Sequence, residues 1–169
     1  KLLRKSLNYP KPIYIRIPRG EEPLVYAADH DYDYEIGKAI VIQEGTDLNF
    51  IATGMGVYNC VQAARQLEEK GYSVGVIDMH TIKPIDKDAV VNEACIDETG
   101  KIITVEDHNI LGGLGSIVAD TLLEAGVFAK LKKIGVPDKF IEFGYPEEIY
   151  PALGMDANGI YKTALEVLK

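Results

Sequence analysis

The chain has 169 residues, with 18 basic and 26 acidic groups, a net charge of −8 and 47% apolar residues. This apolar fraction excludes a disordered polar tail, and the length fits one domain, or one domain with a piece of another. The longest uncharged stretch, residues 48–64, contains polar residues and glycines, so it does not form a transmembrane helix of about 20 apolar residues.

The start of the chain has no signal-peptide pattern of basic and then apolar residues. It begins at Lys1 without an initiator Met, so we interpret it as a fragment or a processed product. Its two cysteines, Cys60 and Cys95, form no C-x-x-C pair, and a domain of this size needs no disulfide. With no N-x-S/T site either, we expect a cytoplasmic location.

Charge is distributed unevenly along the chain. Residues 1–20 contain six basic groups and no acidic group, whereas the rest of the chain contains 12 basic and 26 acidic groups, a balance of −14. A basic arm of this kind can bind nucleic acid. However, residues 13–17 (IYIRI) alternate as a strand does, and so acidic a body repels phosphate backbones. We therefore expect no nucleic-acid binding.

The first 36 residues lack the elements of an independent domain. Residues 1–12 predict a helix end and a proline-containing turn, and residues 13–17 predict a strand. One short helix and one strand cannot bury each other's apolar faces, so we interpret residues 1–20 as the tail end of a preceding domain. Residues 21–36, rich in acidic residues and tyrosine, are interpreted as a linker.

From Gly37 onward, apolar β-branched runs alternate with helical patterns. The first two runs, residues 39–43 and 48–53, predict a hairpin around a short loop that contains glycine. The other predicted strands lie at residues 74–79, 102–105 and 133–136, the last with a continuation at residues 140–141. The predicted helices lie at residues 57–67, 86–99, 114–125 and 147–150, and from residue 158 to the end.

This alternation predicts an α/β fold. We expect a three-layer α/β/α sandwich with a mixed, mostly parallel sheet of about five strands, one of them antiparallel. Residues 37–169 form this single domain.

Two glycine-rich loops each follow a strand and open a helix. Residues 53–56 (TGMG) resemble the start of a dinucleotide fingerprint, and Asp78 stands near the place of its ribose-binding acid, but Asn59 replaces the third glycine. Residues 112–116 (GGLGS) can present N–H groups to an anion, but no P-loop Lys-Ser or Lys-Thr follows. For both loops we favour glycines that let the chain turn between packed layers, with nucleotide or anion binding as the alternative.

Metal sites have little support. Three acidic residues alternate as at the start of a calcium loop, but Tyr34 and Ile40 stand where that loop needs Gly and Glu. These residues are Asp29, Asp31 and Asp33. None of the three histidines, His30, His80 and His108, has a partner at ligand spacing. We therefore predict no metal ligand.

Candidate catalytic groups are also few. Cys60 and Cys95 lie in predicted helices, where we expect them to be small buried apolar residues. Glu106, Asp107 and His108 end a parallel strand, at the edge where α/β sheets place ligands, and the acids can raise the pKa of the histidine. Catalysis and an interdomain salt bridge or hydrogen bond both stay open for them, because no nucleophile or cofactor group accompanies them. We predict no catalytic residue.

Three strings closely resemble the C-terminal domain of transketolases, in order and spacing, over nearly all of residues 37–169. They are ATG (52–54), VIDMHTIKPID (76–86), and TVEDH with GGLG (104–108 and 112–115). The segment PIYIRIPRG (12–20) is similar to the end of the family's pyrimidine-binding domain. The resemblance therefore implies a tail end of that domain at residues 1–20, a linker at 21–36 and a transketolase-like C-terminal domain at 37–169.

Other strings are more similar to 1-deoxy-D-xylulose-5-phosphate synthase, a sister enzyme. They are PRG (18–20), VPDKFIE (136–142) and LGMDANGI (153–160). We favour transketolase because MHTIKP (79–84) and EDH (106–108) match it, and we keep the synthase as the alternative. A non-catalytic regulatory or assembly module is the alternative from another class.

The resemblance implies a transferase of the pentose phosphate pathway that uses thiamine diphosphate and Mg²⁺ to pass two-carbon ketol units between sugar phosphates. The family's diphosphate-binding Gly-Asp-Gly motif is absent from this sequence, and its cofactor-activating glutamate belongs upstream of Lys1. We therefore expect the chain alone to bind no cofactor and to be inactive. It should serve in domain packing and dimer assembly, with the remaining domains or subunit of a homodimeric enzyme as partners.

One family site residue falls inside the chain. Arg19 aligns with the arginine that holds the phosphate of the sugar substrate, a role that suits the planar fork of a guanidinium group. The alternative is a solvated arginine in an interdomain turn. Arg16, three residues earlier, has no such support from the resemblance.

Overall fold

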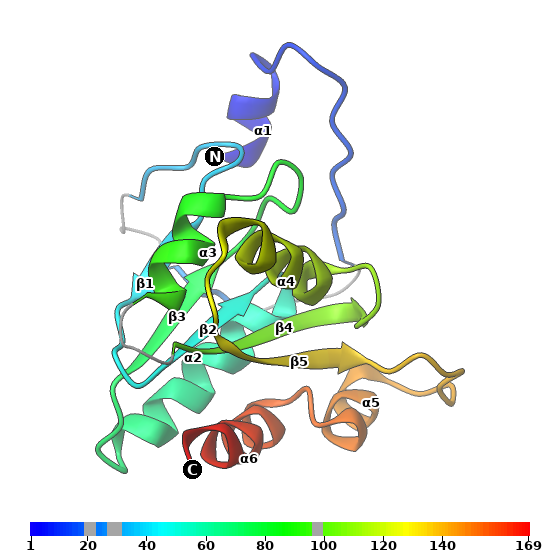
Figure 1. Cartoon of the computed structure of the whole chain (residues 1–169). Helices are drawn as coiled ribbons and strands as arrows, with labels where there is room; N and C mark the ends of the chain where they lie inside the picture. The colour runs from blue at the N-terminus through cyan, green and yellow to red at the C-terminus, as the bar shows by residue number, and fades with distance from the viewer. Residues whose placement is uncertain (19–22, 27–31, 96–99) are drawn as a thin grey trace.

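The computed structural model describes residues 1–18, 23–26, 32–95 and 100–169 (Figure 1). The helices are α1 (Leu2–Ser6), α2 (Met55–Glu68), α3 (Lys87–Ala94), α4 (Leu114–Ala125), α5 (Pro146–Leu153) and α6 (Ala157–Leu168). The strands are β1 (Ile40–Gln43), β2 (Leu48–Ala52), β3 (Val74–Asp78), β4 (Lys101–Asn109) and β5 (Lys130–Val136).

The five strands form one mixed sheet in the order β1-β3-β2-β4-β5. Four strands are parallel, and β1 is the antiparallel strand, at one edge beside β3. The central strand β2 is buried at every position, and its Ile51 is in register with Ile77 of β3 and Thr104 of β4. The predicted mixed sheet of about five strands with one antiparallel member is confirmed.

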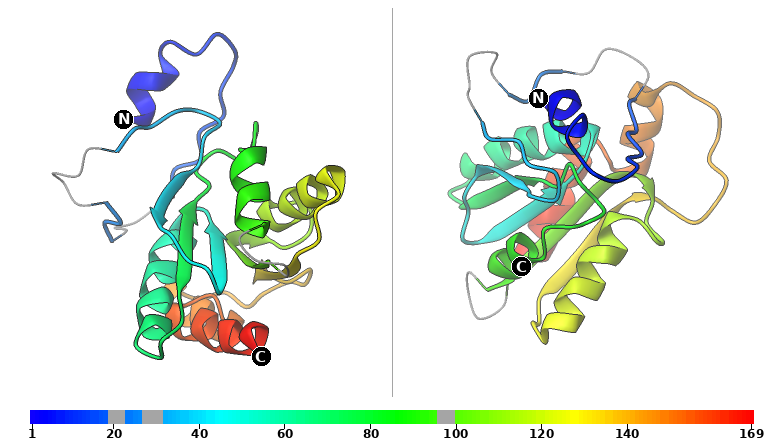
Figure 2. Two further views of the ribbon diagram at one scale, coloured as in Figure 1. Left: turned by 60° about the vertical axis from the view of Figure 1, so that its left-hand side comes forward. Right: turned by 90° about the horizontal axis from the view of Figure 1, so that it is seen from above.

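Each face of the sheet carries a separate hydrophobic core, because alternate side chains of a strand point to opposite faces. Phe50 of β2 packs in the core that includes Leu67 of α2 and Ile160 of α6, whereas its neighbour Ile51 packs with Val118 of α4 on the other face. Figure 2 shows the resulting layers, with α2 and α6 on one side of the sheet and α3 and α4 on the other. The predicted three-layer α/β/α sandwich is therefore confirmed.

The hairpin predicted from residues 39–53 is wrong, since β1 pairs with β3 and does not neighbour β2. The loop between β1 and β2 crosses the start of β3. There Asp47 donates its N–H to the carbonyl oxygen of Ser73 at 2.8 Å, and a Cβ on Gly45 would collide with the backbone of β3. The glycine of this short loop thus permits a close crossing and does not form a hairpin turn.

Other predicted boundaries also differ from the structure. Residues 13–17 form no strand, because they pair with neither edge strand of the sheet, β1 or β5. Residues 140–141 likewise do not continue β5. Helix α3 stops at Ala94, whereas residues 96–99 of the predicted helix lie outside the described residues, and α5 is longer than the predicted turn.

The N-terminal segment, residues 1–18, lies apart from both cores. Helix α1 buries none of its residues, and Figure 1 shows it standing away from the sheet, on the opposite side of the molecule from the C-terminus. From α1 the chain runs back toward the end of β4, where Arg16 contacts Asp107. The segment therefore meets the domain at the carboxyl ends of the parallel strands.

Candidate functional site

The carboxyl ends of β2, β3 and β4 lie side by side and form an edge that we call the carboxyl edge. The helices that follow β2 and β4, α2 and α4, cover opposite faces of the sheet. Open α/β sheets bind ligands at such a reversal of connectivity, the topological switch point. The residues at or just beyond these strand ends are Thr53, Gly54, Asp78, His80, Glu106, Asp107 and His108. This edge is therefore the candidate site.

Some residues singled out in the sequence are not placed at this edge. Arg19, predicted to bind substrate phosphate, lies outside the described residues, as do Asp29, His30 and Asp31. Asp33 is exposed, with a carboxylate oxygen 3.9 Å from the ammonium group of Lys5. Within the described part of the chain, no three His, Cys, Asp or Glu side chains gather as a metal site would require. The role of Arg19 stays a prediction.

The carboxylate of Glu106 binds the backbone N–H groups at the start of α4. Its side chain is buried and accepts hydrogen bonds from the backbone N–H groups of Leu114, at 2.8 Å, and Gly115, at 2.9 Å. A Cβ on Gly113 would collide with this carboxylate. Helix N-termini attract anions, and here Glu106 satisfies that preference. The geometry therefore favours the structural interpretation of the GGLG loop over an external anion site.

The TGMG loop before α2 is also used for packing. A Cβ on Gly56 would lie 3.0 Å from Val105, so the glycine lets α2 approach β4 closely. Asn59, which replaces the third glycine of a dinucleotide fingerprint, is buried and donates its amide to the carbonyl oxygen of Met155 at 3.0 Å. It ties α2 to the turn before α6. The geometry favours packing over nucleotide binding for this loop.

Asp107 links the carboxyl edge to the N-terminal segment. Its Oδ2 accepts a hydrogen bond from Nη1 of Arg16 at 2.8 Å, and its side chain is only 9% exposed. Its other oxygen, Oδ1, lies 3.4 Å from Nδ1 of His108 and has no hydrogen-bond partner among the described residues. His108 is half exposed. Of the two roles left open for the Glu-Asp-His string, this geometry favours an ion-pair contact between segments.

Asp78 binds the segment that the sequence identified only as a linker. The hydroxyl of Tyr26 donates to Oδ2 of Asp78 at 2.6 Å, and the ring of Tyr26 stacks on that of Tyr32. Burial raises the pKa of the Asp78 carboxyl to about 6, although the hydrogen bond from Tyr26 acts to lower it. Burial, followed by the charge of Asp78, raises the pKa of Tyr26. Asp78 therefore serves a contact with Tyr26 of the predicted linker.

His80 makes a second contact with this linker. Its ring stacks on the buried ring of Tyr34, with centroids 4.2 Å apart, and its Nδ1 lies 2.8 Å from the hydroxyl of Thr81. Its Nε2 is buried and has no hydrogen-bond partner in the described part of the chain. Burial lowers the pKa of His80, so the imidazole is neutral at neutral pH. Its surroundings are those of an interface residue.

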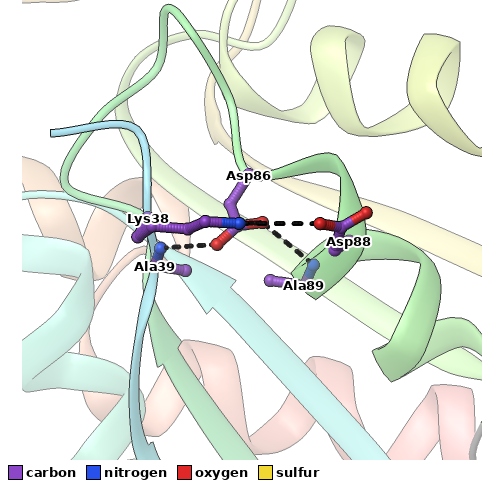
Figure 3. Close-up of polar contacts among 5 residues, drawn as sticks. All are labelled: Lys38, Ala39, Asp86, Asp88 and Ala89. Carbon is purple, nitrogen blue, oxygen red and sulfur yellow. Dashed lines mark hydrogen bonds and ion pairs between the residues drawn. The ribbon is translucent and has the colours of Figure 1, made fainter. Parts of the chain in front are cut away.

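Asp86, the last residue of the VIDMHTIKPID string, joins the start of β1 to α3 (Figure 3). Its carboxylate accepts hydrogen bonds from the backbone N–H groups of Ala39, at 3.0 Å, and Ala89, at 3.3 Å, and Lys38 pairs with both Asp86 and Asp88. Burial acts to raise the pKa of Asp86, but these hydrogen bonds and the Lys38 charge lower it below its ordinary value. This string therefore stabilises the fold through a helix cap.

The two cysteines differ from each other. Cys60 is buried in α2, as predicted, and burial raises the pKa of its thiol. The prediction for Cys95 is wrong, because α3 ends at Ala94 and leaves Cys95 exposed. None of the helices in the described parts of the chain has the length and apolarity needed to cross a bilayer.

Sequence reasoning missed Arg16 and Tyr26 as functional contacts. The resemblance gives Arg16 no role as a phosphate ligand, and Tyr26 lies in a stretch interpreted as a solvated linker. The excess of tyrosines at residues 21–36 is the signal that indicates packing there, since an amphipathic ring with a hydroxyl suits a half-buried polar partner.

The carboxyl edge does not fit thiamine diphosphate and Mg²⁺. Glu106 occupies the start of α4, and the described residues offer no cluster of metal ligands. Its acidic side chains serve α4, the linker and the N-terminal segment. The edge therefore binds other segments of the same chain: the start of α4, Arg16 and Tyr26.

Comparisons with known proteins show what the chain is similar to. Residues 37–160 match the family model for the transketolase C-terminal domain. The chain is similar to a subunit of apulose-4-phosphate transketolase from Phocaeicola vulgatus, with 45% identity over 169 residues, covering 100% of this chain and 53% of the relative. It is also similar to 1-deoxy-D-xylulose-5-phosphate synthase of Halothermothrix orenii, with 34% identity over 171 residues, covering 99% of this chain and 26% of the synthase.

A solved structure shows the same fold. It is described as a split-gene transketolase in an inactive beta4 tetramer, and it superposes with a TM-score of 0.86 at 31% identity. The match covers 99% of this chain and 52% of that chain. The chain thus spans about half the length of the transketolase subunits that it resembles.

Proposed function

Because this chain belongs to the transketolase C-terminal domain family, we propose that it is the carboxyl-terminal part of a thiamine-diphosphate-dependent transketolase that transfers two-carbon ketol units between sugar phosphates. Its own task is domain packing and assembly. The observation that carries this proposal is the carboxyl edge, where a domain of this fold would bind a ligand. There Glu106, Asp107 and Asp78 instead contact the chain itself.

The remaining domains or subunit of the enzyme are the proposed partners, in a homodimer. Exposed apolar side chains support such interfaces, because monomers rarely gather them in one region. Phe140 and Phe143 are fully exposed on the loop after β5, next to exposed Tyr145. Cys60 and Cys95 are free cysteines, which agrees with the expected cytoplasmic location.

Substrate binding by this chain rests on Arg19. The resemblance assigns it the phosphate of the sugar substrate, and Pro18 and Gly20 on either side favour a turn with room for a long side chain. A guanidinium group binds phosphate oxygens in pairs, which gives both affinity and orientation. We therefore propose Arg19 as the substrate residue of this chain.

The second candidate is the C-terminal part of 1-deoxy-D-xylulose-5-phosphate synthase. The observation in its favour is 34% identity over 171 residues. We keep it second because the identity with a transketolase subunit, over the whole chain, is higher, at 45%.

The test is an assay of the complete enzyme that contains this chain, supplied with thiamine diphosphate and Mg²⁺. We expect two-carbon transfer between sugar phosphates, and no turnover by residues 1–169 alone. Formation of 1-deoxy-D-xylulose 5-phosphate without ketol transfer would identify the second candidate. Turnover by the isolated chain would contradict the assembly role.

A further inference from the structure

We propose that the carboxyl edge between β2 and β4 is a guanidinium site, and that Arg16 of the N-terminal segment occupies it. The proposal goes beyond the function above, because it assigns a partner and a ligand class to the switch point. Figure 1 shows the segment descending from α1 toward the end of β4, the strand that carries Asp107.

The contact has the geometry of a built site. Nη1 of Arg16 donates to Oδ2 of Asp107 at 2.8 Å, with the Asp107 side chain 9% exposed and the Arg16 side chain 43% exposed. The acceptor is thus almost buried, while the donor enters from the solvent side. A carboxylate so far removed from water needs a cationic partner to offset its lost hydration.

The second oxygen of Asp107 defines the inner wall of the site. Oδ1 is buried without a hydrogen bond among the described residues, and a Cβ on Gly54 would stand in ordinary van der Waals contact with it, at 3.6 Å. Gly54 thus lies beside Oδ1, on the side of the carboxylate away from Arg16. A guanidinium group carries five N–H donors in a planar fork and is weakly hydrated. It therefore suits a nearly buried carboxylate with one unpaired oxygen better than an ammonium group does.

The surrounding carboxylates disfavour an anionic ligand. Glu106 and Asp107 both bring carboxylates to this end of β4, and Glu106 is already engaged with α4. The imidazole of His108 lies on the Oδ1 side, 3.4 Å away, and leaves the Oδ2 side to Arg16. A cation is therefore the favoured occupant, and in this structure that cation is the guanidinium group of Arg16, from the same chain.

The experiment uses the full chain, whose mass of 18.6 kDa suits solution NMR. In the wild type, ¹⁵N relaxation should report residues 13–17 as ordered. R16A and D107N should each increase their fast motion to a similar extent, with no further increase in the double variant. K11A removes an exposed basic residue of the same segment and should leave residues 13–17 unchanged. If D107N does not fold, R16A, which alters only the segment, decides the result.

The vacated site provides the second readout. Millimolar methylguanidinium should shift the amide signals of Gly54 and His108 in R16A, but not in the wild type or in R16A/D107N. Inorganic phosphate should cause no shift at these amides. Unchanged motion of residues 13–17 in R16A, methylguanidinium shifts that persist without Asp107, or phosphate binding at this edge would each overturn the proposal.

Discussion

The body of the domain and the residues that precede it are held in place by different contacts. Between residues 37 and 169 the sheet and helices bury apolar side chains in two cores, whereas among the described residues before Leu48 only Tyr34 is a buried hydrophobic side chain. Of the preceding residues, Val25 is a partly buried apolar side chain packed against the core that contains Phe50, and the polar and ring contacts to the body are Arg16–Asp107, Tyr26–Asp78 and Tyr34–His80. Apolar burial thus builds the domain, whereas polar and ring contacts at the carboxyl edge make up most of the attachment of the preceding residues.

The largest expected effect comes from the core of the body. Phe50 is completely buried, so Phe50→Ala should lower the free energy of unfolding by about 3–5 kcal/mol through lost burial and a cavity. Phe143→Ala is the matched control, because this side chain is fully exposed and its loss should leave stability nearly unchanged. Urea unfolding of both variants measures the difference. Equal losses would contradict the assignment of the core to the sheet.

Replacing Glu106 tests whether a residue of the carboxyl edge also contributes to the stability of residues 37–169. Glu106→Ala removes the buried acceptor of two N–H groups at the start of α4 and should cost roughly 2–4 kcal/mol. Glu124→Ala, near the other end of the same helix, removes only an exposed pair with Lys87 and should have a small effect. Thermal unfolding of the two variants gives the comparison. A small loss for Glu106→Ala would mean that α4 does not need this acceptor.

Replacing Arg19 tests whether the residues before Gly37 contribute to substrate binding rather than to the stability of the fold. In the complete enzyme, Arg19→Ala should lose a charge-assisted contact of roughly 1.5–3 kcal/mol, or about 10- to 150-fold in affinity. The loss should appear in KM for phosphorylated substrates and much less for an unphosphorylated analogue. Equal kinetic losses on both substrates, or a large fall in Tm, would show that Arg19 is structural.

Asp78 gives the attachment its pH dependence. The pKa of the Asp78 carboxyl rises from an ordinary 3.8 to about 6 in the folded chain, because burial disfavours its charged form. The contribution of this carboxyl to the free energy of unfolding is therefore fully present below pH 4 and is lost as the pH rises through 6. Asp78→Asn should therefore stabilise the chain at pH 8 by about 1–2 kcal/mol, since the side chain is only partly buried, and by much less at pH 4. Urea unfolding at both pH values checks this. A gain that is the same at pH 4 and pH 8 would contradict the raised pKa.

The sequence predicted the body well because its signals are local. Hydrophobic runs such as residues 48–53 and 74–79 and the αL glycine Gly126 mark elements that tertiary contacts then confirm. The hairpin prediction was wrong because strand pairing is not a local property. The loop at Gly45 crosses close to the start of β3, so β1 lies on the far side of β3 from β2 and pairs with β3. A strand at residues 13–17 failed because alternation alone supplies no partner strand.

The site was harder to predict than the fold. The acidic string at Glu106 was found from its place at a strand end, but the roles of its members depend on which backbone N–H groups and side chains approach them. Arg16 and Tyr26 approach from 91 and 52 residues away in the sequence, and no spacing rule connects such pairs. Predicting them requires the course of the linker as well as the topology of the sheet.

The most direct test of this division is the unfolding of residues 37–169 without the preceding residues. We predict one cooperative transition, with a free energy of unfolding lower by no more than about 3 kcal/mol, because the truncated chain keeps both cores and loses mainly the contacts at the carboxyl edge. In the full chain, limited proteolysis should cut within residues 21–35 and leave the body intact. A truncated chain without a cooperative transition, or equal protection of both parts from proteolysis, would contradict it.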